Sequence, residues 1–417
     1  MSTATAPIES SPDAGSPRLA AELGGGPFVL ALLAVHLYFV AYSMSIVGVP
    51  QSLQGQPDWL VGLVVGALGI SGMLTRPLVG VWVDGGNRRR WQRLGAVLTI
   101  VAFVGYATTS NPWVTIGFRF VHGIAMGLFT TAQLAIVSGM LTERRRGLGM
   151  GLYQSANAIS QMYGAPLMVA LALGVSFSAG FGVAAVFAAA ALGTAVLIPD
   201  VEGARLQAAP ARARVWITRP AVAPAFVFLS MTTPVGAVQA FLPLFALERN
   251  LGNVGLFYTV WGLALLVSRA LSGALSDRLG RTQVMLPSLA LGAASLIAIT
   301  GAHSQTTLLA AAVLYGLSFA AVQVTALALI IDRTPPEGRG GGAATYTMAW
   351  DVGAVLGGIL LGLVIEVTTY AMGFFICALL PVLGIALYLV MPPAQPPQKA
   401  STAPVEATAV AAGDTSG

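Results

Sequence analysis

The chain of 417 residues carries the same short motif twice, at a spacing of 193 residues. The segment that begins at Gly80 reads GVWVDGGNRR, and the segment that begins at Gly273 reads GALSDRLGR. Nine identical pairs share this spacing: Arg76/Arg269, Gly80/Gly273, Asp84/Asp277, Pro50/Pro243, Gly123/Gly316, Arg146/Arg339, Gly147/Gly340, Tyr153/Tyr346 and Gly164/Gly357. One spacing that holds across four regions indicates that the chain consists of two duplicated halves.

The duplicated material is predicted to span a membrane. Hydrophobic residues make up 56% of the chain and charged residues 9%, whereas soluble domains carry about 25% charged residues. The mean hydropathy is +0.79. An α-helix needs about 20 apolar residues to cross a bilayer, and helices satisfy their own backbone hydrogen bonds there. Twelve runs have this character: 27–50, 59–82, 93–110, 112–140, 146–173, 176–198, 221–246, 254–276, 283–301, 305–331, 340–367 and 370–391.

The sequence therefore predicts an all-α membrane protein with twelve transmembrane helices in two pseudo-symmetric bundles of six. The expected parts are a disordered tail (1–26), a first bundle (27–198), a linker (199–220), a second bundle (221–391) and a second disordered tail (392–417). Arginines cluster after the even-numbered runs, and the opposite side holds only Arg249. By the positive-inside rule, both tails and the linker are predicted to be cytoplasmic.

Composition also excludes several classes of function. The basic residues are confined to short loops, so no nucleic-acid partner is expected. A single cysteine, Cys377, rules out an intramolecular disulfide and a cysteine-based metal site. The one lysine, Lys399, lies in the C-terminal tail, which excludes a P-loop ATPase. No cofactor and no metal are expected.

Twelve spans in two similar halves, together with the twin motif after spans 2 and 8, resemble the major facilitator superfamily. The second motif copy is complete, whereas Gly85 and Asn87 depart from the pattern in the first copy. The span-11 segment from Thr345 to Gly353 resembles the bacterial efflux branch related to arabinose-efflux permeases. The resemblance implies a central cavity between two rocking bundles, a monomeric multi-pass protein of the bacterial inner membrane, and no enzymatic activity.

The resemblance also implies a gating role for the twin motif. The gating residues expected from it are Gly80, Asp84, Arg88, Gly273, Asp277, Arg278, Gly280 and Arg281. Glycine permits close helix contact, and an aspartate beside arginines can latch one bundle to the other. The alternative is that these charges only fix loop geometry and topology.

Ionisable residues at membrane depth are candidates for proton coupling, because each is costly to insert. Asp351 is the one carboxylate predicted near the midplane, and its expected partner is Arg76 or Arg269. The resemblance implies that span 11 packs near span 2, which favours Arg76. Desolvation favours a neutral carboxyl group and a nearby arginine favours the carboxylate, so such a group can exchange a proton as its surroundings alternate. A permanent structural ion pair is the alternative. Arg119 is expected to serve coupling or substrate contact, with packing as its alternative.

The expected substrate-binding residues are the polar and aromatic side chains of the central spans: His36, Tyr42, His122, Gln133, Gln239, Arg269, Gln323 and Trp350. The remaining lining is apolar, which favours a small amphipathic substrate. Arg269 resembles the anion-binding arginine of oxalate and monocarboxylate porters, and a guanidinium matches a carboxylate.

The leading hypothesis is a secondary active transporter that exports a small molecule by proton antiport. The alternative is uptake or exchange of a small organic anion through Arg269. An intramembrane enzyme is disfavoured because the sequence contains neither HExxH nor GxSxG. A receptor or channel is disfavoured by the duplication and the twin motif.

Overall fold

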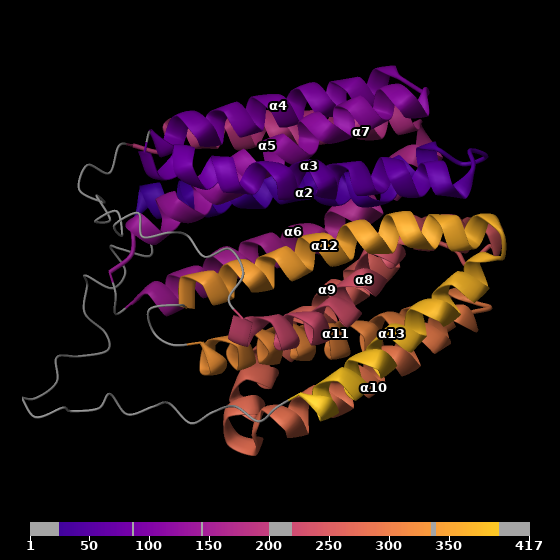
Figure 1. Ribbon diagram of the computed structural model, residues 1–417. Coiled ribbons are helices and arrows are strands. Elements are labelled where there is room, and N and C mark those ends of the chain that lie inside the picture. The colour runs from indigo at the N-terminus through magenta and orange to yellow at the C-terminus, as the bar shows by residue number, and fades with distance from the viewer. Residues whose placement is uncertain (1–24, 86, 143–144, 200–218, 335–338, 392–417) are drawn as a thin grey trace, which may run out of the picture.

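The computed structural model describes residues 25–85, 87–142, 145–199, 219–334 and 339–391 (Figure 1). These ranges contain α-helices and no strands. The first half comprises α2 (Gly26–Ser52), α3 (Asp58–Gly85), α4 (Arg88–Thr108), α5 (Pro112–Gly139), α6 (Arg146–Gly174) and α7 (Phe177–Leu197). The second comprises α8 (Arg219–Glu248), α9 (Gly255–Leu279), α10 (Arg281–Thr300), α11 (Gln305–Arg333), α12 (Arg339–Glu366) and α13 (Tyr370–Val390).

The helix starts reproduce the spacing of the sequence repeat. Helices α2, α4, α5, α6 and α7 each begin 193 residues before their counterparts α8, α10, α11, α12 and α13. The tails 1–24 and 392–417 and the linker region 200–218 lie outside the described residues. The expected all-α fold of twelve helices in two similar halves is confirmed for the part of the chain that is described.

Eleven of the twelve described helices are long and apolar enough to cross a membrane. The exception is α4, which has 21 residues and begins with three consecutive arginines. Every 18-residue stretch of this helix includes Gln92 and Arg93, which lowers its hydropathy. It nevertheless packs beside α5 and α7 as a full member of the first bundle.

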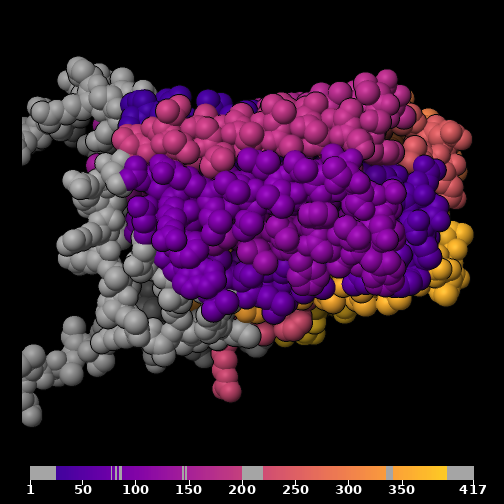
Figure 2. Space-filling view, turned by 90° about the horizontal axis from the view of Figure 1, so that it is seen from above, coloured from indigo at the N-terminus to yellow at the C-terminus, as the bar shows by residue number. Residues whose placement is uncertain are grey.

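Within each half the helices pack in the same pattern. In the first half α3 packs on α5, α4 lies against α5 and α7, and α2 lies against α6 and α7. In the second half α9 packs on α11, α10 lies against α11 and α13, and α8 lies against α12 and α13. The outer face of the first bundle is a continuous surface over α4 and α7 (Figure 2). Its exposed apolar side chains include Val97, Val101, Val104 and Val186, which suit contact with lipid.

The two halves meet chiefly along three helix pairs, α3 with α12, α6 with α9, and α2 with α8, and α3 also touches α8. In Figure 1, α12 and α6 lie in the middle of the molecule, between the outer helices of the two halves.

We call the end that carries the arginine-containing turns around residues 87–90 and 278–281 the basic end, and the other end the opposite end.

Glycines allow the closest approach between the halves. A Cβ on Gly62 would collide with the backbone oxygen of Gly358, and one on Gly362 would lie 2.7 Å from the backbone oxygen of Asp58. A Cβ on Gly255 of α9 would likewise collide with Pro166 of α6. All these contacts lie toward the opposite end, where α3 and α9 begin and α6 and α12 end. The halves are therefore packed most tightly at the opposite end.

Candidate functional site

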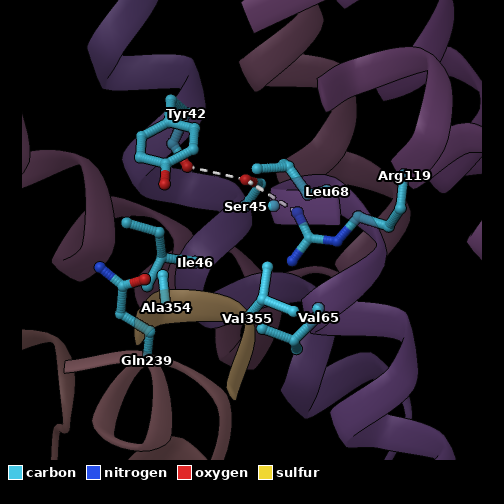
Figure 3. A pocket seen from close by; sticks show the side chains of 11 residues that line it. Tyr42, Ser45, Ile46, Val65, Leu68, Arg119, Gln239, Ala354 and Val355 are labelled. Atoms are coloured by element: carbon cyan, nitrogen blue, oxygen red, sulfur yellow. Dashed lines mark hydrogen bonds between the residues drawn. The ribbon is translucent and has the colours of Figure 1, made fainter. Parts of the chain in front are cut away.

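A cavity lies between the two halves, about midway along the helices (Figure 3). It contains about 430 Å³ of space between atoms, part of it open to solvent. Its lining residues are Tyr42, Ser45, Ile46, Val65, Gly66, Leu68, Gly69, Arg119, Gln239, Ala354 and Val355. They come from α2, α3 and α5 in the first half and from α8 and α12 in the second. An apolar lining with a few polar side chains is typical of small-molecule sites.

Asp351 and Arg76 form an ion pair across the interface between the halves. The Oδ1 atom of Asp351 lies 3.1 Å from an Nη atom of Arg76. The Asp351 side chain is 11% exposed and the Arg76 side chain 30% exposed. Asp351 lies one helical turn from Val355 of the cavity. The structure therefore brings together the two residues that the sequence suggested as partners.

Arg119 reaches the cavity from α5 and is nearly completely buried. Its Nη1 atom lies 3.5 Å from Ser45 Oγ, which in turn donates to the backbone oxygen of Tyr42 (Figure 3). The guanidinium also lies 5.9 Å from the centre of the Tyr106 ring. Its Nε atom is buried without a hydrogen-bond partner. In the part of the chain that is described, no carboxylate forms an ion pair with it.

His122 lies one turn from Arg119 on the same helix and is fully buried. Its Nδ1 atom is 3.2 Å from the Tyr106 hydroxyl, and its Nε2 atom is buried without a hydrogen-bond partner. Its ring packs against those of Tyr42 and Phe103. His122 thus lies behind the cavity wall, in contact with Tyr42, which faces the cavity.

Arg269, the counterpart of Arg76, is held within its own half. Its Nε and Nη2 atoms donate to Gln323 Oε1 at 3.2 Å and 2.9 Å. Gln323 also accepts, at its backbone oxygen, a hydrogen bond of 3.4 Å from the Tyr346 hydroxyl. Two predicted substrate-binding residues therefore bind each other, between α9 and α11.

The other predicted binding residues are distributed over several environments. Tyr42 and Gln239 line the cavity. Gln133 is fully buried inside the first bundle, where its amide donates to the backbone oxygen of Ala31 and accepts from Gln92.

His36 and Trp350 lie apart from the side chains that line the cavity. The two ring nitrogens of His36 lie 2.9 Å from the Ala156 backbone oxygen and 2.6 Å from the Tyr163 hydroxyl, between α2 and α6. Trp350 packs on Phe228 and Phe319 within the second bundle.

The second copy of the repeated motif forms a network at the basic end. Arg281 donates from Nη1 to Asp277 Oδ1 at 2.5 Å and from Nε to Asp332 Oδ2 at 2.9 Å. All three residues belong to the second half, so this network joins α9, α10 and α11 rather than the two halves. Gly280 adopts φ of +100°, a conformation that favours glycine. Gly273 and Arg278 lie in the last turns of α9.

The first copy differs in its chain reversal. Gly80 and Asp84 belong to α3, and only their backbone is described. Asn87 stands where the second copy has Gly280, and its side chain accepts from the backbone N–H groups of Arg89 and Arg90. Its φ of −75° requires no glycine, which explains why the motif tolerates asparagine here. Arg88 donates to the backbone oxygen of Ala135 at 3.5 Å.

Sequence reasoning missed a contact between the halves at the opposite end. Glu366 Oε2 accepts from the backbone N–H groups of Asp58 and Trp59 at 2.8 Å and 3.4 Å, and so caps the start of α3. The Tyr370 hydroxyl donates to Asp58 Oδ1 at 2.7 Å. One signal was available: Gly62/Gly66 and Gly358/Gly362 are Gly-x-x-x-Gly pairs, which mark close helix contacts in membranes.

Comparison with known proteins places this architecture in a family. The family model described as Major Facilitator Superfamily matches residues 31–280 and 225–413. The chain is 22% identical over 377 residues to the staphylopine export protein of Staphylococcus aureus, covering 85% of this chain and 93% of that protein. It is 25% identical over 374 residues to an uncharacterized MFS-type transporter of Salmonella typhimurium, with the same coverage.

A solved structure agrees at the level of the fold. The crystal structure of the nucleoside transporter NupG superimposes with a TM-score of 0.72 at 14% sequence identity. The match covers 87% of this chain and 99% of that one. The repeat, the helical architecture, the cavity between the halves and the family match together show that this chain belongs to the major facilitator superfamily of membrane transporters.

Proposed function

We propose that this transporter exports a small amphipathic molecule from the bacterial cytoplasm across the inner membrane by proton antiport, with Asp351 as the proton-coupling group and Arg76 as its partner. The observation that carries the proposal is the ion pair between these residues. Among the ion pairs of the described residues, this one joins the two halves. It lies one helical turn from the cavity.

The pair couples protonation to the relative position of the halves. While Asp351 is charged, its attraction to Arg76 stabilises the packing of α12 on α3. A proton on Asp351 removes that attraction and leaves a neutral group in a low-dielectric setting. Binding of a proton therefore biases the equilibrium between two arrangements of the bundles, as alternating access requires.

The packing at the opposite end supports a cavity that opens at the basic end. By the positive-inside rule the arginine-containing turns face the cytoplasm, so the present state is the one that takes up cargo from the cytoplasm. In this state Arg281 of the second motif copy donates to Asp277 and Asp332, which belong to the same half. The latch between bundles expected from the motif would then form in the other state. The similarity to a protein named as an exporter supports the outward direction.

The test is the substitution Asp351→Asn in proteoliposomes. A thermal-stabilisation screen of the purified protein first identifies a transported compound, since a ligand that binds the folded state raises its melting temperature. We expect Asp351→Asn to abolish transport driven by a pH gradient while exchange of labelled for unlabelled substrate continues. Glu248→Gln is the matched control, because Glu248 is exposed at the end of α8. Persistence of gradient-driven transport in Asp351→Asn would refute the coupling role.

The second candidate function is exchange of a small organic anion. The predicted residue for it, Arg269, already donates two hydrogen bonds to Gln323. Arg119 is the arginine that faces the cavity between the halves. Transport that is independent of a pH gradient and stimulated by the same anion on the far side of the membrane would favour this function over proton antiport.

A further inference from the structure

We infer that Arg119 binds an acidic group of the cargo, so that the transported molecule is a small amphipathic organic acid. This inference rests on the proposed function and specifies the substrate class of the same cavity. Arg119 is only 3% exposed. A buried guanidinium that lacks an anionic partner is costly unless a ligand supplies one.

The residues around Arg119 leave room for such a partner. The groups that face it are the Ser45 hydroxyl at 3.5 Å, the Tyr106 ring at 5.9 Å and the neighbouring His122. None of these carries a negative charge in its usual form, and the buried Nε atom has no acceptor. A guanidinium offers a planar fork of donors that matches a carboxylate. Arg119 therefore reaches the cavity with guanidinium N–H groups that could donate to a bound anion.

The duplicated scaffold does not require an arginine at this place. The counterpart of Arg119 at the spacing of 193 residues is Ala312, which is fully buried in α11. The second bundle therefore packs at this depth without a charge. By contrast Arg76 and Arg269 occupy equivalent places, and each has a protein partner.

The rest of the cavity defines the remainder of the cargo. Val65, Leu68 and Val355 form an apolar wall beside Arg119, and Ile46 extends the apolar lining toward Gln239 (Figure 3). Tyr42 and Gln239, from opposite halves, supply polar groups away from Arg119. A molecule with one acidic group, an apolar body and a hydrogen-bonding end satisfies all three parts. Because the lining comes from both halves, such a cargo contacts both bundles at once.

The test uses three probes that share an indole ring and differ in charge: indole-3-propionate, indole-3-propionamide and tryptamine. Their binding to the full-length purified protein is measured in detergent by thermal stabilisation and by isothermal calorimetry at pH 7. We expect the carboxylate to bind more tightly than the amide and the amine. In Arg119→Gln its affinity should fall by about 10- to 100-fold, as expected for a lost charge-assisted contact.

Two further variants make the result specific. Arg119→Lys should retain part of the preference for the carboxylate, because it keeps the charge and loses the fork. Arg249→Gln is the matched control and should leave the preference unchanged, because Arg249 lies at the opposite end and donates to the backbone oxygens of Thr300 and Ala302. Equal binding of the three probes, no binding of any probe, an unchanged preference in Arg119→Gln, or loss of the preference in Arg249→Gln would each overturn the inference.

Failure of this inference is separable from failure of the proposed function. The binding measurement needs no membrane and no gradient, whereas the Asp351→Asn experiment measures coupling alone. Preserved pH-driven transport of a compound that binds without regard to charge would overturn only the role of Arg119. Carboxylate binding without pH-driven transport would overturn only the coupling.

Discussion

Arg76 and Arg269 occupy the same place in the two halves, yet they have different partners. Arg76 forms an ion pair with Asp351 of the other half. Arg269 donates to the neutral side chain of Gln323 in its own half. The counterpart of Asp351 is Ala158, and the counterpart of Gln323 is Thr130. The duplication therefore preserved the two cations and changed their acceptors. Among the described residues, an ionic link between the halves is present on one side of the pseudo-symmetry and not on the other.

The largest expected effect comes from removing Arg76. Arg76→Gln leaves Asp351 as a nearly buried carboxylate without its cation, and breaking a buried pair costs about 3–5 kcal/mol. Arg269→Gln removes charged hydrogen bonds to a neutral oxygen, and contacts of this kind contribute about 1.5–3 kcal/mol. Chemical unfolding in detergent should therefore rank Arg76→Gln as the more destabilised variant.

A double substitution checks that the difference arises from pairing. Arg76→Gln with Asp351→Asn removes both charges and should recover part of the lost stability, since no unpaired charge remains. Equal losses in Arg76→Gln and Arg269→Gln would show that the two arginines are energetically equivalent, in conflict with their different partners.

Overpacking the contact between α3 and α12 should disturb the surroundings of Arg76 and leave those of Arg269 unchanged. Gly62→Leu forces α3 away from α12, because even a Cβ at this place collides with Gly358. Overpacking of this kind costs about 1–3 kcal/mol. Spin labels at the exposed positions Gln56 and Thr368, in a Cys377→Ser background, should report a longer distance between the halves at the opposite end.

The matched control for this helix contact is Gly117→Leu in α5, where a Cβ would meet nothing within 4 Å. It should leave the distance between the labels unchanged. An unchanged distance in Gly62→Leu as well would mean that the glycine contact does not hold the halves together at this end.

The smallest effect is expected at the cap that Glu366 places on α3. Glu366→Gln keeps an acceptor for the backbone N–H groups of Asp58 and Trp59 and loses only the charge. An anion at an exposed helix N-terminus contributes about 0.3–1 kcal/mol. We expect the free energy of unfolding to fall by this amount. We also expect more molecules to occupy the state in which the two halves are separated at the opposite end. Glu248→Gln, at the end of α8, should have a smaller effect, because Glu248 caps no described helix and acts on this contact only through its charge near Tyr370.

Much of the fold was accessible from the sequence because its physical signals are strong. Long apolar runs and a repeat of fixed spacing predict twelve helices in two halves, and five of the six pairs of observed helix starts keep that spacing. A lone carboxylate at membrane depth needs a cation, so Arg76 or Arg269 was expected to pair with Asp351. The family resemblance favoured Arg76, which is the partner in the structure. The roles assigned to these residues in coupling stay predictions.

The composition of the site was less accessible. Gln133 and Gln323 were expected to bind substrate, but the structure shows them bonded to groups in their own bundles. A polar residue on a membrane helix satisfies its hydrogen bonds wherever a neighbour offers an acceptor, and the sequence does not record which neighbour that is. The capping of α3 by Glu366 escaped notice for the same reason, because the two residues involved are 308 positions apart.

The sequence by itself determined the membrane class, the duplication and the family of this protein, because hydropathy and repeat spacing are properties of the chain alone. Only the tertiary structure decided that Arg76 faces a carboxylate, Arg269 a glutamine and Arg119 an open cavity. These outcomes depend on how the helices of the two halves approach each other, and that approach is set by packing among residues far apart in the chain.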